Sequence, residues 1–383
     1  MTRIPFSRPS IGEEEIADVV DCLRSGWITS GPRTARFEKE FAARHGAAQA
    51  LAVTSATAGL HLAMLALELQ PGDEVITTPL TWPATVNAIV LAGGTPVLVD
   101  IEPETLNLDP GLVARAVTRR TRAVLPVHYA GQPCDLDAIA AAAPGARLIE
   151  DAAHAVGATY RGRPIGGIGD AAIFSFHPIK NITTGEGGMV TTNDAELAKR
   201  ISLLRFHGVE RDAWKAYGGA QLPLYDVVLP GLKYNLTDIQ SAIGLQQLRK
   251  LDAFNAERAR LAARYDAALT EVPALRPLGR VAYPCTHVHH LYVVRIDPAR
   301  LTIDRNAFMA EVITAGVGLG LHFTAVHELT YYRQRLGDLR AALPVATDAS
   351  ARLFSLPLFP GLSESEQDRV VEVLADVAGR HRR

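Results

Sequence analysis

The chain has 383 residues, of which 48% are hydrophobic and 21% are charged, and 39 basic against 41 acidic residues leave a net charge of −2. This composition is typical of a folded globular chain and excludes disorder as its main state. Because there is no basic excess, we expect no nucleic-acid partner, and the length predicts two or three domains.

Nothing in the sequence indicates export or membrane insertion. The most apolar segment, residues 58–69, contains His61 and Glu68 and is shorter than the ~20 residues that a bilayer requires. The first ten residues lack the apolar core and cleavage pattern of a signal peptide. The three cysteines are too far apart to suggest a metal-binding pair or a disulfide framework. We therefore expect a cytoplasmic protein without a membrane partner.

Short apolar runs alternate with helical patterns through the first half of the chain. Helices are predicted at residues 56–69, 83–91, 109–117 and 135–143. Strands are predicted at residues 49–54, 74–78, 96–100, 122–127, 147–150, 171–176 and 189–192. Continuous apolar strands separated by helices predict an α/β fold whose mostly parallel sheet is covered on both faces.

The second half changes character. Residues 208–232 are polar and predict a long ordered loop, and residues 238–267 predict a long helix. An alternating strand at 291–296 and helices at 305–315 and 364–377 then predict a smaller α+β domain. We expect a large domain over residues 1–255, including an N-terminal segment, and a small C-terminal domain over residues 256–383.

Small polar residues open the helix that follows the first predicted strand. In open α/β sheets, ligands bind beyond the carboxyl ends of the strands. Ser55, Ala56 and Thr57 lie at such an end. There, backbone N–H groups, hydroxyls and the helix dipole favour a phosphate. The simpler interpretation is a helix cap, which Ser and Thr form in many proteins.

An acid and a lysine follow two other strands. Asp151 comes directly after strand 147–150, and His154 comes three residues later. A carboxylate buried there requires a cationic partner, although a capping Asp is a common alternative. Lys180 follows strand 171–176 and precedes a glycine-rich turn. A lysine held in such a crevice can lose its proton and form an imine with a carbonyl, whereas a lone lysine usually lies in solvent.

Together these residues match the needs of pyridoxal 5'-phosphate (PLP). Its phosphate suits a helix N-terminus, its pyridine nitrogen needs an acid to stay protonated, and its aldehyde needs a lysine. Trp82 follows strand 74–78 and reaches the same edge of the sheet, where it can stack on the pyridine ring or serve as a half-buried core aromatic. We therefore predict a PLP site.

The motifs along the chain resemble the sugar-nucleotide aminotransferases of the DegT/StrS type. The motifs, in chain order, are SGWITSGP (25–32), SATAGLHLA (55–63), TPLTWPAT (78–85), PVHYAGQPCDLDAI (126–139), IEDAAHA (149–155), FSFHPIKNITTGEGGMV (174–190), FHG (206–208) and KYNLTDIQSAIG (233–244). The resemblance extends to SLPLFPGLSESE (355–366) and so covers nearly the whole chain. VHYAGQPCDLDAI and FSFHPIKNIT are most similar to the enzymes that make UDP-4-amino-4-deoxy-L-arabinose for lipid A modification.

The resemblance implies the PLP-dependent transferase fold type I, as a homodimer whose active sites lie at the subunit interface. It implies that Lys180 is the Schiff-base lysine and that Asp151 pairs with the pyridine nitrogen. It implies further cofactor contacts as follows: Trp82 stacks on the ring, His154 lies near the phenolic oxygen, Ser55, Ala56, Thr57 and Ser175 hold the phosphate, and Asn235 reaches the phosphate in the neighbouring subunit.

The resemblance also implies a two-stage amino transfer. L-Glutamate gives its amino group and leaves as 2-oxoglutarate, and a 4-keto nucleotide sugar, most closely a UDP-4-keto-pentose, then accepts the group. One alternative is a 4-keto-6-deoxyhexose nucleotide, in O-antigen, glycan or antibiotic amino-sugar synthesis. Another is a PLP-binding regulatory protein without turnover, which the intact Lys180 and Asp151 disfavour. A dehydrogenase is not favoured, because the glycine run at 166–169 precedes a strand rather than a helix.

Two histidine groups remain. His287, His289 and His290 resemble a metal cluster, but we favour the entry to a strand and predict no metal. His322, in the run GLHF (320–323), lies where the arabinose-type enzymes have a similar block. We therefore expect a substrate contact from His322, including one made to the other subunit's site.

Overall fold

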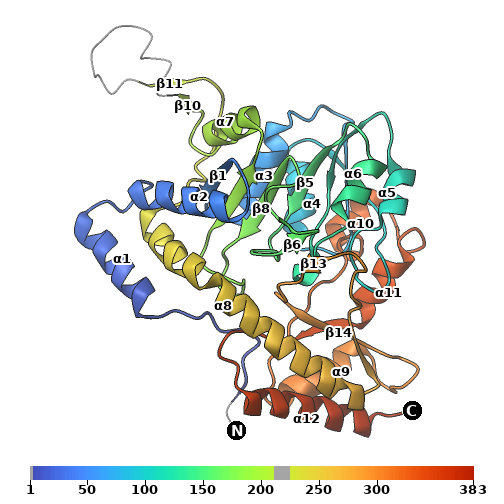
Figure 1. The fold of residues 1–383 in the computed structure, drawn as a ribbon. Helices are drawn as coiled ribbons and strands as arrows, with labels where there is room; N and C mark the ends of the chain where they lie inside the picture. Colours follow the sequence, from blue (N-terminus) through green and yellow to red (C-terminus); the bar gives the residue numbers. More distant parts are fainter. Residues whose placement is uncertain (1–2, 211–224) are drawn as a thin grey trace.

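The computed structural model describes residues 3–210 and 225–383 (Figure 1). The helices are α1 (Glu13–Ser25), α2 (Pro32–Arg44), α3 (Ala56–Ala66), α4 (Pro83–Leu91), α5 (Pro110–Ala116), α6 (Leu136–Ala142), α7 (Ala195–Leu204), α8 (Asp238–Ala268), α9 (Arg305–Thr314), α10 (Thr330–Leu336), α11 (Pro344–Arg352) and α12 (Glu364–Arg380). In this part of the chain, no helix is both long and apolar enough to cross a membrane.

The strands form one large sheet and several small ones. The large sheet has the order β1-β9-β8-β5-β4-β2-β3, and all its neighbours run parallel except at β9, which is antiparallel to both β1 and β8. The prediction of a mostly parallel α/β sheet is therefore confirmed. Its strands are β1 (Gln49–Val53), β2 (Glu74–Thr77), β3 (Thr95–Leu98), β4 (Thr121–Leu125), β5 (Arg147–Asp151), β8 (Ala171–Ser175) and β9 (Gly188–Thr192).

Side chains alternate between the two faces of this sheet and build a separate core on each. Ala50 and Ala52 of β1 pack with α2, α5, α6 and α8, whereas Leu51 and Val53 pack with α3, α4 and α7. Both faces are thus apolar, which explains why these strands appear in the sequence as continuous hydrophobic runs. Helix α3 lies so close that a Cβ on Gly59 would come within 2.9 Å of Ile173.

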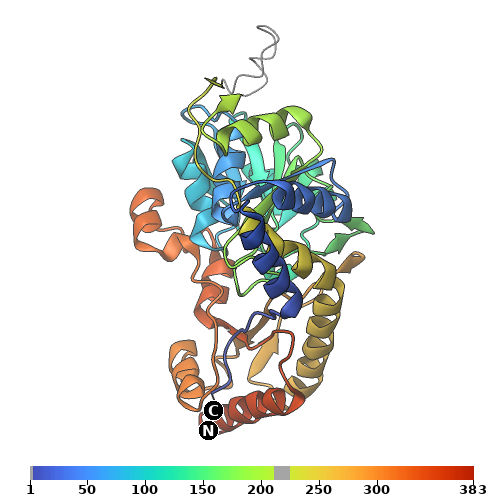
Figure 2. The same cartoon turned by 90° about the vertical axis from the view of Figure 1, so that its left-hand side faces the viewer.

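The C-terminal part has its own core around an antiparallel sheet, β12-β14-β15. The small strands are β6 (Thr159–Tyr160), β7 (Arg163–Pro164), β10 (Val209–Glu210), β11 (Asp226–Val227), β12 (Leu275–Pro277), β13 (Cys285–Thr286), β14 (Tyr292–Ile296) and β15 (Leu353–Leu356). The second half of α8, together with α9 and α12, packs against this sheet, as the lower part of Figures 1 and 2 shows. The N-terminal segment joins it, because Ile4 exchanges backbone hydrogen bonds with Gly316 and Gly318.

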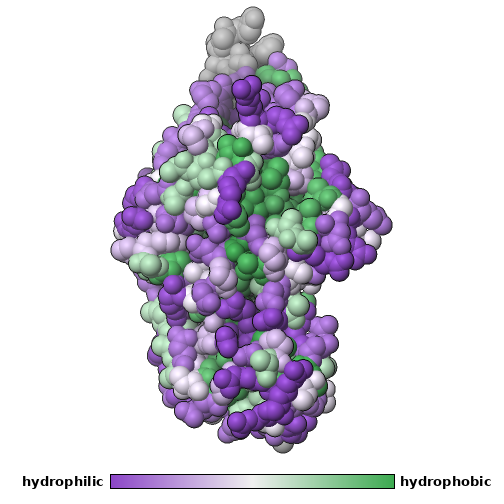
Figure 3. Space-filling view, turned by 90° about the vertical axis from the view of Figure 1, so that its right-hand side faces the viewer, coloured by the Kyte–Doolittle hydropathy of each residue, from purple (hydrophilic) through white to green (hydrophobic). Residues whose placement is uncertain are grey.

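Helix α8 runs without a break from the large sheet to the small one (Figure 1). The predicted division at residue 255 falls inside this helix and stays a prediction. Figure 3 shows the face at the right-hand side of Figure 1, where hydrophobic residues gather in the middle of the upper part and hydrophilic ones predominate below.

Three sequence-based expectations differ from the structure. The predicted helix 56–69 ends at Ala66, and Glu68 adopts a left-handed φ of 53°. The strand expected to alternate at 291–296 is instead buried on both faces, because β14 is the central strand of its sheet and packs between two apolar clusters. Of the loop expected at 208–232, residues 211–224 lie outside the described residues, and the flanking residues pair as β10 and β11.

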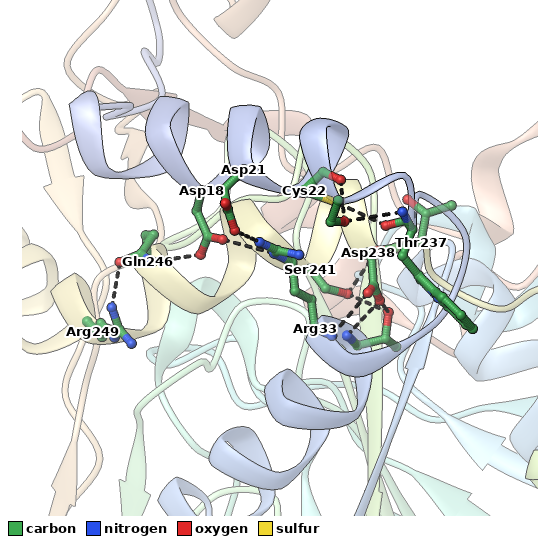
Figure 4. A network of polar contacts seen from close by, with 12 residues as sticks. Asp18, Asp21, Cys22, Arg33, Thr237, Asp238, Ser241, Gln246 and Arg249 are labelled. Atoms are coloured by element: carbon green, nitrogen blue, oxygen red, sulfur yellow. Dashed lines mark hydrogen bonds and ion pairs between the residues drawn. The ribbon is translucent and has the colours of Figure 1, made fainter.

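One buried carboxylate, that of Asp238, joins α2 to α8 (Figure 4). Thr237 caps α8 in a capping box with Gln240, which leaves the next side chain, Asp238, free to face α2. The start of α2 has no cap from its own residues. Asp238 accepts hydrogen bonds there from the backbone N–H groups of Gly31, Arg33 and Thr34, at 2.8, 3.1 and 2.9 Å. A residue about 200 positions away thus supplies the N-terminal cap of α2.

We predict that Asp238→Ala lowers the free energy of unfolding by about 3 kcal/mol, because several buried N–H donors lose their acceptor. Urea or thermal unfolding measures the change. Asp21→Ala is the matched control: Asp21 belongs to the same network through Arg33, but its side chain is 76% exposed, so we expect a loss below ~1 kcal/mol. Equal losses for the two variants would contradict the capping role.

Candidate active site

A cavity of about 360 Å³ lies at the carboxyl ends of β5 and β8 and the N-terminus of α3. This is the edge of the sheet where the sequence placed the ligand site. The lining includes nine of the predicted site residues: Ser55, Ala56, Thr57, Trp82, Asp151, His154, Ser175, Lys180 and His322. The structure therefore brings together residues that lie up to 267 positions apart in the chain (322 − 55).

The start of α3 forms a small-residue cradle. Ser55 caps the helix by accepting a hydrogen bond from the backbone N–H of Ala58 at 3.0 Å. Strand β9 approaches this turn so closely that a Cβ on Gly188 would lie 2.7 Å from the backbone nitrogen of Ala56. The exposed Thr57 and the free N–H groups of the first turn remain available to an anion. The helix cap and the phosphate site are thus compatible roles of one segment.

Lys180 lies in the turn after β8, and its backbone N–H donates to the carbonyl of His177 at 2.9 Å. Its Nζ is 3.5 Å from Nε2 of His290. Burial lowers the pKa of Lys180 to about 8, and the charge of Asp151 opposes this shift. The amine is therefore partly neutral near pH 8 and can act as a nucleophile there.

Asp151 is the last residue of β5 and is buried. Its Oδ2 accepts from the hydroxyl of Thr85 at 2.8 Å, and its Oδ1 accepts from the N–H of Ala153 at 3.1 Å. Burial raises the pKa of Asp151, while these hydrogen bonds and the charge of Lys180 act in the opposite direction. A bound cation, such as a protonated pyridine nitrogen, would favour the charged form further.

Aromatic rings close the cavity. The ring of His154 stacks on Phe323 at 5.8 Å and lies 4.4 Å from the ring of His290. Burial holds the pKa of His154 well below its usual range, so the ring is neutral. Its Nδ1 has no hydrogen-bond partner among residues 3–210 and 225–383. Trp82 borders the cavity with 63% of its surface exposed, which leaves its ring free to support a flat ligand.

His322 lines the cavity of its own chain. Its Nδ1 lies 2.9 Å from the hydroxyl of Ser355, and its ring stacks on Phe6. Burial lowers the pKa of His322 to about 3. The residue is thus a neutral polar group on the wall of this cavity, and the expected contact with the other subunit's site stays a prediction.

Asn235 does not line this cavity. Its Nδ2 donates to the hydroxyl of Ser30 at 2.6 Å, and its Oδ1 has no partner within the described residues. The prediction that Asn235 reaches the phosphate of a neighbouring subunit therefore stays a prediction.

His287 and His289 stack on each other at 3.9 Å just before β14. Within the described residues, no group of three His, Cys, Asp or Glu side chains is arranged to hold a metal ion. The third histidine of this run, His290, points to Lys180 instead, a role that its neighbours in the sequence did not indicate.

The cavity residues fit PLP in four respects. The cradle at α3 suits a phosphate, Asp151 lacks a cation within its hydrogen-bond set, Lys180 is a buried amine of lowered pKa, and His154 has an unpaired ring nitrogen in the described part of the chain.

Residues 9–375 match the DegT/DnrJ/EryC1/StrS aminotransferase family. The chain belongs to this family.

Solved structures with the same fold extend this result. Spr1654 of Streptococcus pneumoniae, assigned as a sugar aminotransferase and solved in its PLP form, is 34% identical with a TM-score of 0.90, covering 99% of both chains. The aminotransferase TlmJ of Streptoalloteichus hindustanus is 33% identical with a TM-score of 0.89, covering 98% of this chain and 99% of TlmJ. PseC of Helicobacter pylori, an aminotransferase involved in the biosynthesis of pseudoaminic acid, is 27% identical with a TM-score of 0.88, covering 99% of this chain and 100% of PseC.

The protein is therefore a PLP-dependent sugar aminotransferase of fold type I. The site residues that the sequence interpretation missed include Thr81, Thr85, His290 and Phe323. The sequence could have indicated Thr81 and Thr85, because they lie on either side of Trp82, four residues apart, in the motif TPLTWPAT. Nothing in the local sequence separates His290 from its neighbours.

We predict that covalent attachment of PLP to the cofactor-free protein accelerates as pH rises and levels off above about pH 8. Only the neutral amine of Lys180 attacks the aldehyde, and burial makes that form available at lower pH than in an ordinary lysine. Stopped-flow absorbance measures the rate. A half-maximal rate near pH 10.5, the ordinary lysine value, would contradict the structure. Lys180→Ala is the control, and we expect it to lose both attachment and turnover at every pH.

Proposed function

We propose that the enzyme transfers the amino group of L-glutamate to a 4-keto nucleotide sugar, and that this sugar is a UDP-4-keto-pentose. The proposal rests on the arabinose-type segments 127–139 and 174–183. Both segments border the cavity: Tyr129 donates its hydroxyl hydrogen to the carbonyl of His322, and the second segment carries Ser175 and Lys180. The similarity is therefore found in the part of the chain that surrounds the substrate space.

The residues of the cavity have distinct roles in this reaction. When bound, PLP supplies an aldehyde for the amine and a ring that accepts the electron pair of the donor's α-carbon. Lys180 would hold PLP through its amine and, once released, would move the proton of the donor's α-carbon, a role as a base to which its lowered pKa suits it. Asp151 would face the pyridine nitrogen and keep a proton on it. Trp82 and Phe323, whose rings lie 6.1 Å apart, both line the cavity and present aromatic surface to the ligand.

A 4-keto-6-deoxyhexose nucleotide is the alternative acceptor. The related PseC is involved in pseudoaminic acid biosynthesis, which shows that the family includes enzymes of other amino-sugar pathways. The motifs that position PLP do not distinguish these sugars. The choice depends on the wall formed by Leu321, His322 and Phe323. The regulatory alternative without turnover is not retained, because the chain belongs to an aminotransferase family.

We predict that, with L-glutamate as donor, the purified enzyme aminates the UDP-4-keto-pentose at least about tenfold more efficiently than a dTDP-4-keto-6-deoxyhexose. Mass spectrometry detects the amino sugar, and the visible absorbance of bound PLP follows each half-reaction. His322→Ala is expected to raise the Michaelis constant for the sugar more than that for L-glutamate. Preference for the hexose would establish the alternative, and an unchanged Michaelis constant for both substrates would remove His322 from the sugar site.

We also propose that the enzyme acts as a homodimer with shared active sites. Helix α1 and the segment after it carry an exposed apolar surface, formed by Ile16, Val20, Leu23, Trp27 and Ile28. Such a surface is usually covered by a partner. Among the described residues that line the cavity, there is no arginine, although a glutamate carboxylate and a nucleotide diphosphate need cationic partners. Residues of a second subunit would supply what this lining lacks.

We predict that Leu23→Glu weakens the dimer by about tenfold or more, because it places a charge on an apolar interface. Light scattering measures the mass, which is expected to be twice 41.2 kDa for the native protein. Activity is expected to fall with the dimer fraction on dilution. Ile313→Glu, a matched exposed residue on α9 with 38% exposure, is expected to change neither. A native protein that is monomeric and fully active would contradict the proposal.

A further inference from the structure

Two threonine hydroxyls form a chain that ends on Asp151. The hydroxyl of Thr85 donates to Oδ2 of Asp151 at 2.8 Å, and the hydroxyls of Thr81 and Thr85 are 2.7 Å apart. Because Thr85 already donates to the carboxylate, Thr81 is the donor in the second bond. Both threonines are buried, with 1% or less of their surface exposed. Hydrogen bonds aligned head to tail in this way polarise and strengthen one another.

We infer that Thr85, supported by Thr81, is a positioning residue that keeps the carboxylate of Asp151 charged and aimed at the pyridine nitrogen of PLP. The inference rests on the cofactor and is independent of which sugar the enzyme accepts. Thr85 acts through Asp151 rather than on the reacting atoms.

Before PLP binds, the charged form of Asp151 needs this support because burial opposes it. Burial favours the neutral acid and raises the pKa of Asp151. The direct hydrogen bonds to the carboxylate come from Thr85 and the N–H of Ala153. The charge of Lys180 also favours the ionised form, but this amine is consumed whenever PLP is attached to it.

Of the other titratable groups, His128 favours the ionised form of Asp151 when it carries a charge, but within the described residues neither His128 nor His154 donates a hydrogen bond to the carboxylate. His128, which follows β4, accepts from the backbone N–H of Cys134 at Nδ1, so its proton lies on Nε2 and faces Glu150 at 2.9 Å. His154 is neutral, since burial holds its pKa well below the usual range. The hydroxyl of Thr85 is therefore the side-chain donor on which the charge of Asp151 depends.

The local sequence explains how this donor is fixed. Trp82 occupies the N-cap of α4 and Pro83 the first helical position, so Thr85 lies in the first turn of the helix. Thr81 precedes the cap and faces Thr85 across that turn. The start of α4 thus carries both the exposed ring of Trp82 and the hydroxyl of Thr85 that contacts Asp151, so one short backbone segment positions both.

The test compares two ligands binding to the cofactor-free protein: PLP, and its 1-deaza analogue, in which a carbon replaces the pyridine nitrogen. We expect Thr85→Val to weaken PLP by about tenfold and the analogue by less than about twofold, because only PLP uses the charge of Asp151. We also expect the affinity of this variant for PLP to fall at a higher pH than in the native protein as the solution is acidified.

Two further variants make the result decisive. Thr85→Ser keeps the hydroxyl and is expected to restore PLP binding, and Thr81→Val removes only the supporting donor and is expected to give a loss of about twofold to threefold. Thr77→Val is the matched control, since Thr77 is also fully buried but donates to the carbonyl of Leu125, away from the cavity. It is expected to leave both affinities unchanged.

Specific outcomes would overturn the inference. Equal losses for PLP and the analogue in Thr85→Val would assign Thr85 a structural role only. Unchanged PLP affinity in that variant would remove it from the site altogether. If Thr85→Val does not fold, Thr81→Val decides the question: a selective loss for PLP supports the hydroxyl chain, and no loss, or an equal one for both ligands, contradicts it.

Discussion

The active site depends on keeping an amine and a carboxylate away from water at one edge of a sheet. Burial shifts both groups toward their neutral forms, which lowers the pKa of Lys180 and raises that of Asp151. For the lysine this shift is useful, because a neutral amine is the reactive form. For the acid it is harmful, because only the charged form holds a proton on the cofactor. The hydroxyl and N–H groups around Asp151 resolve this conflict, and the sheet and α4 hold them in place.

Much of this site could be predicted from the sequence because its main residues follow strands directly. Asp151 ends β5, Lys180 follows β8 and Ser55 precedes α3, so the order of strands and helices places all three at one edge. The strands themselves were predictable because both faces of the sheet are apolar. The glycine-rich segment after Lys180 and the family motifs added the chemistry.

The structural features that the sequence did not indicate depend on contacts between segments that lie far apart in the chain. Asp238 caps a helix from about 200 residues away, so α2 lacks a signal at its own start. His290 meets Lys180 because the chain before β14 packs beside the turn after β8, where the carbonyl of Val288 accepts a hydrogen bond from Asn181. The predicted alternation at 291–296 was wrong for the same kind of reason, since β14 is covered on both sides by clusters that form only in the folded chain.

Helix α8 has a mechanical consequence. Its 31 residues span about 46 Å at ~1.5 Å per residue, and they belong to both cores. Any rotation of the C-terminal part relative to the large sheet must therefore bend helix α8. A flexible linker in the same place would allow that rotation without bending a helix. Trp82 precedes α4, which packs on the large sheet, and His322 is held through Ser355 by β15 of the small sheet. The cavity therefore lies between two parts of the chain that one continuous helix holds together, so the fold rather than the ligand sets its width.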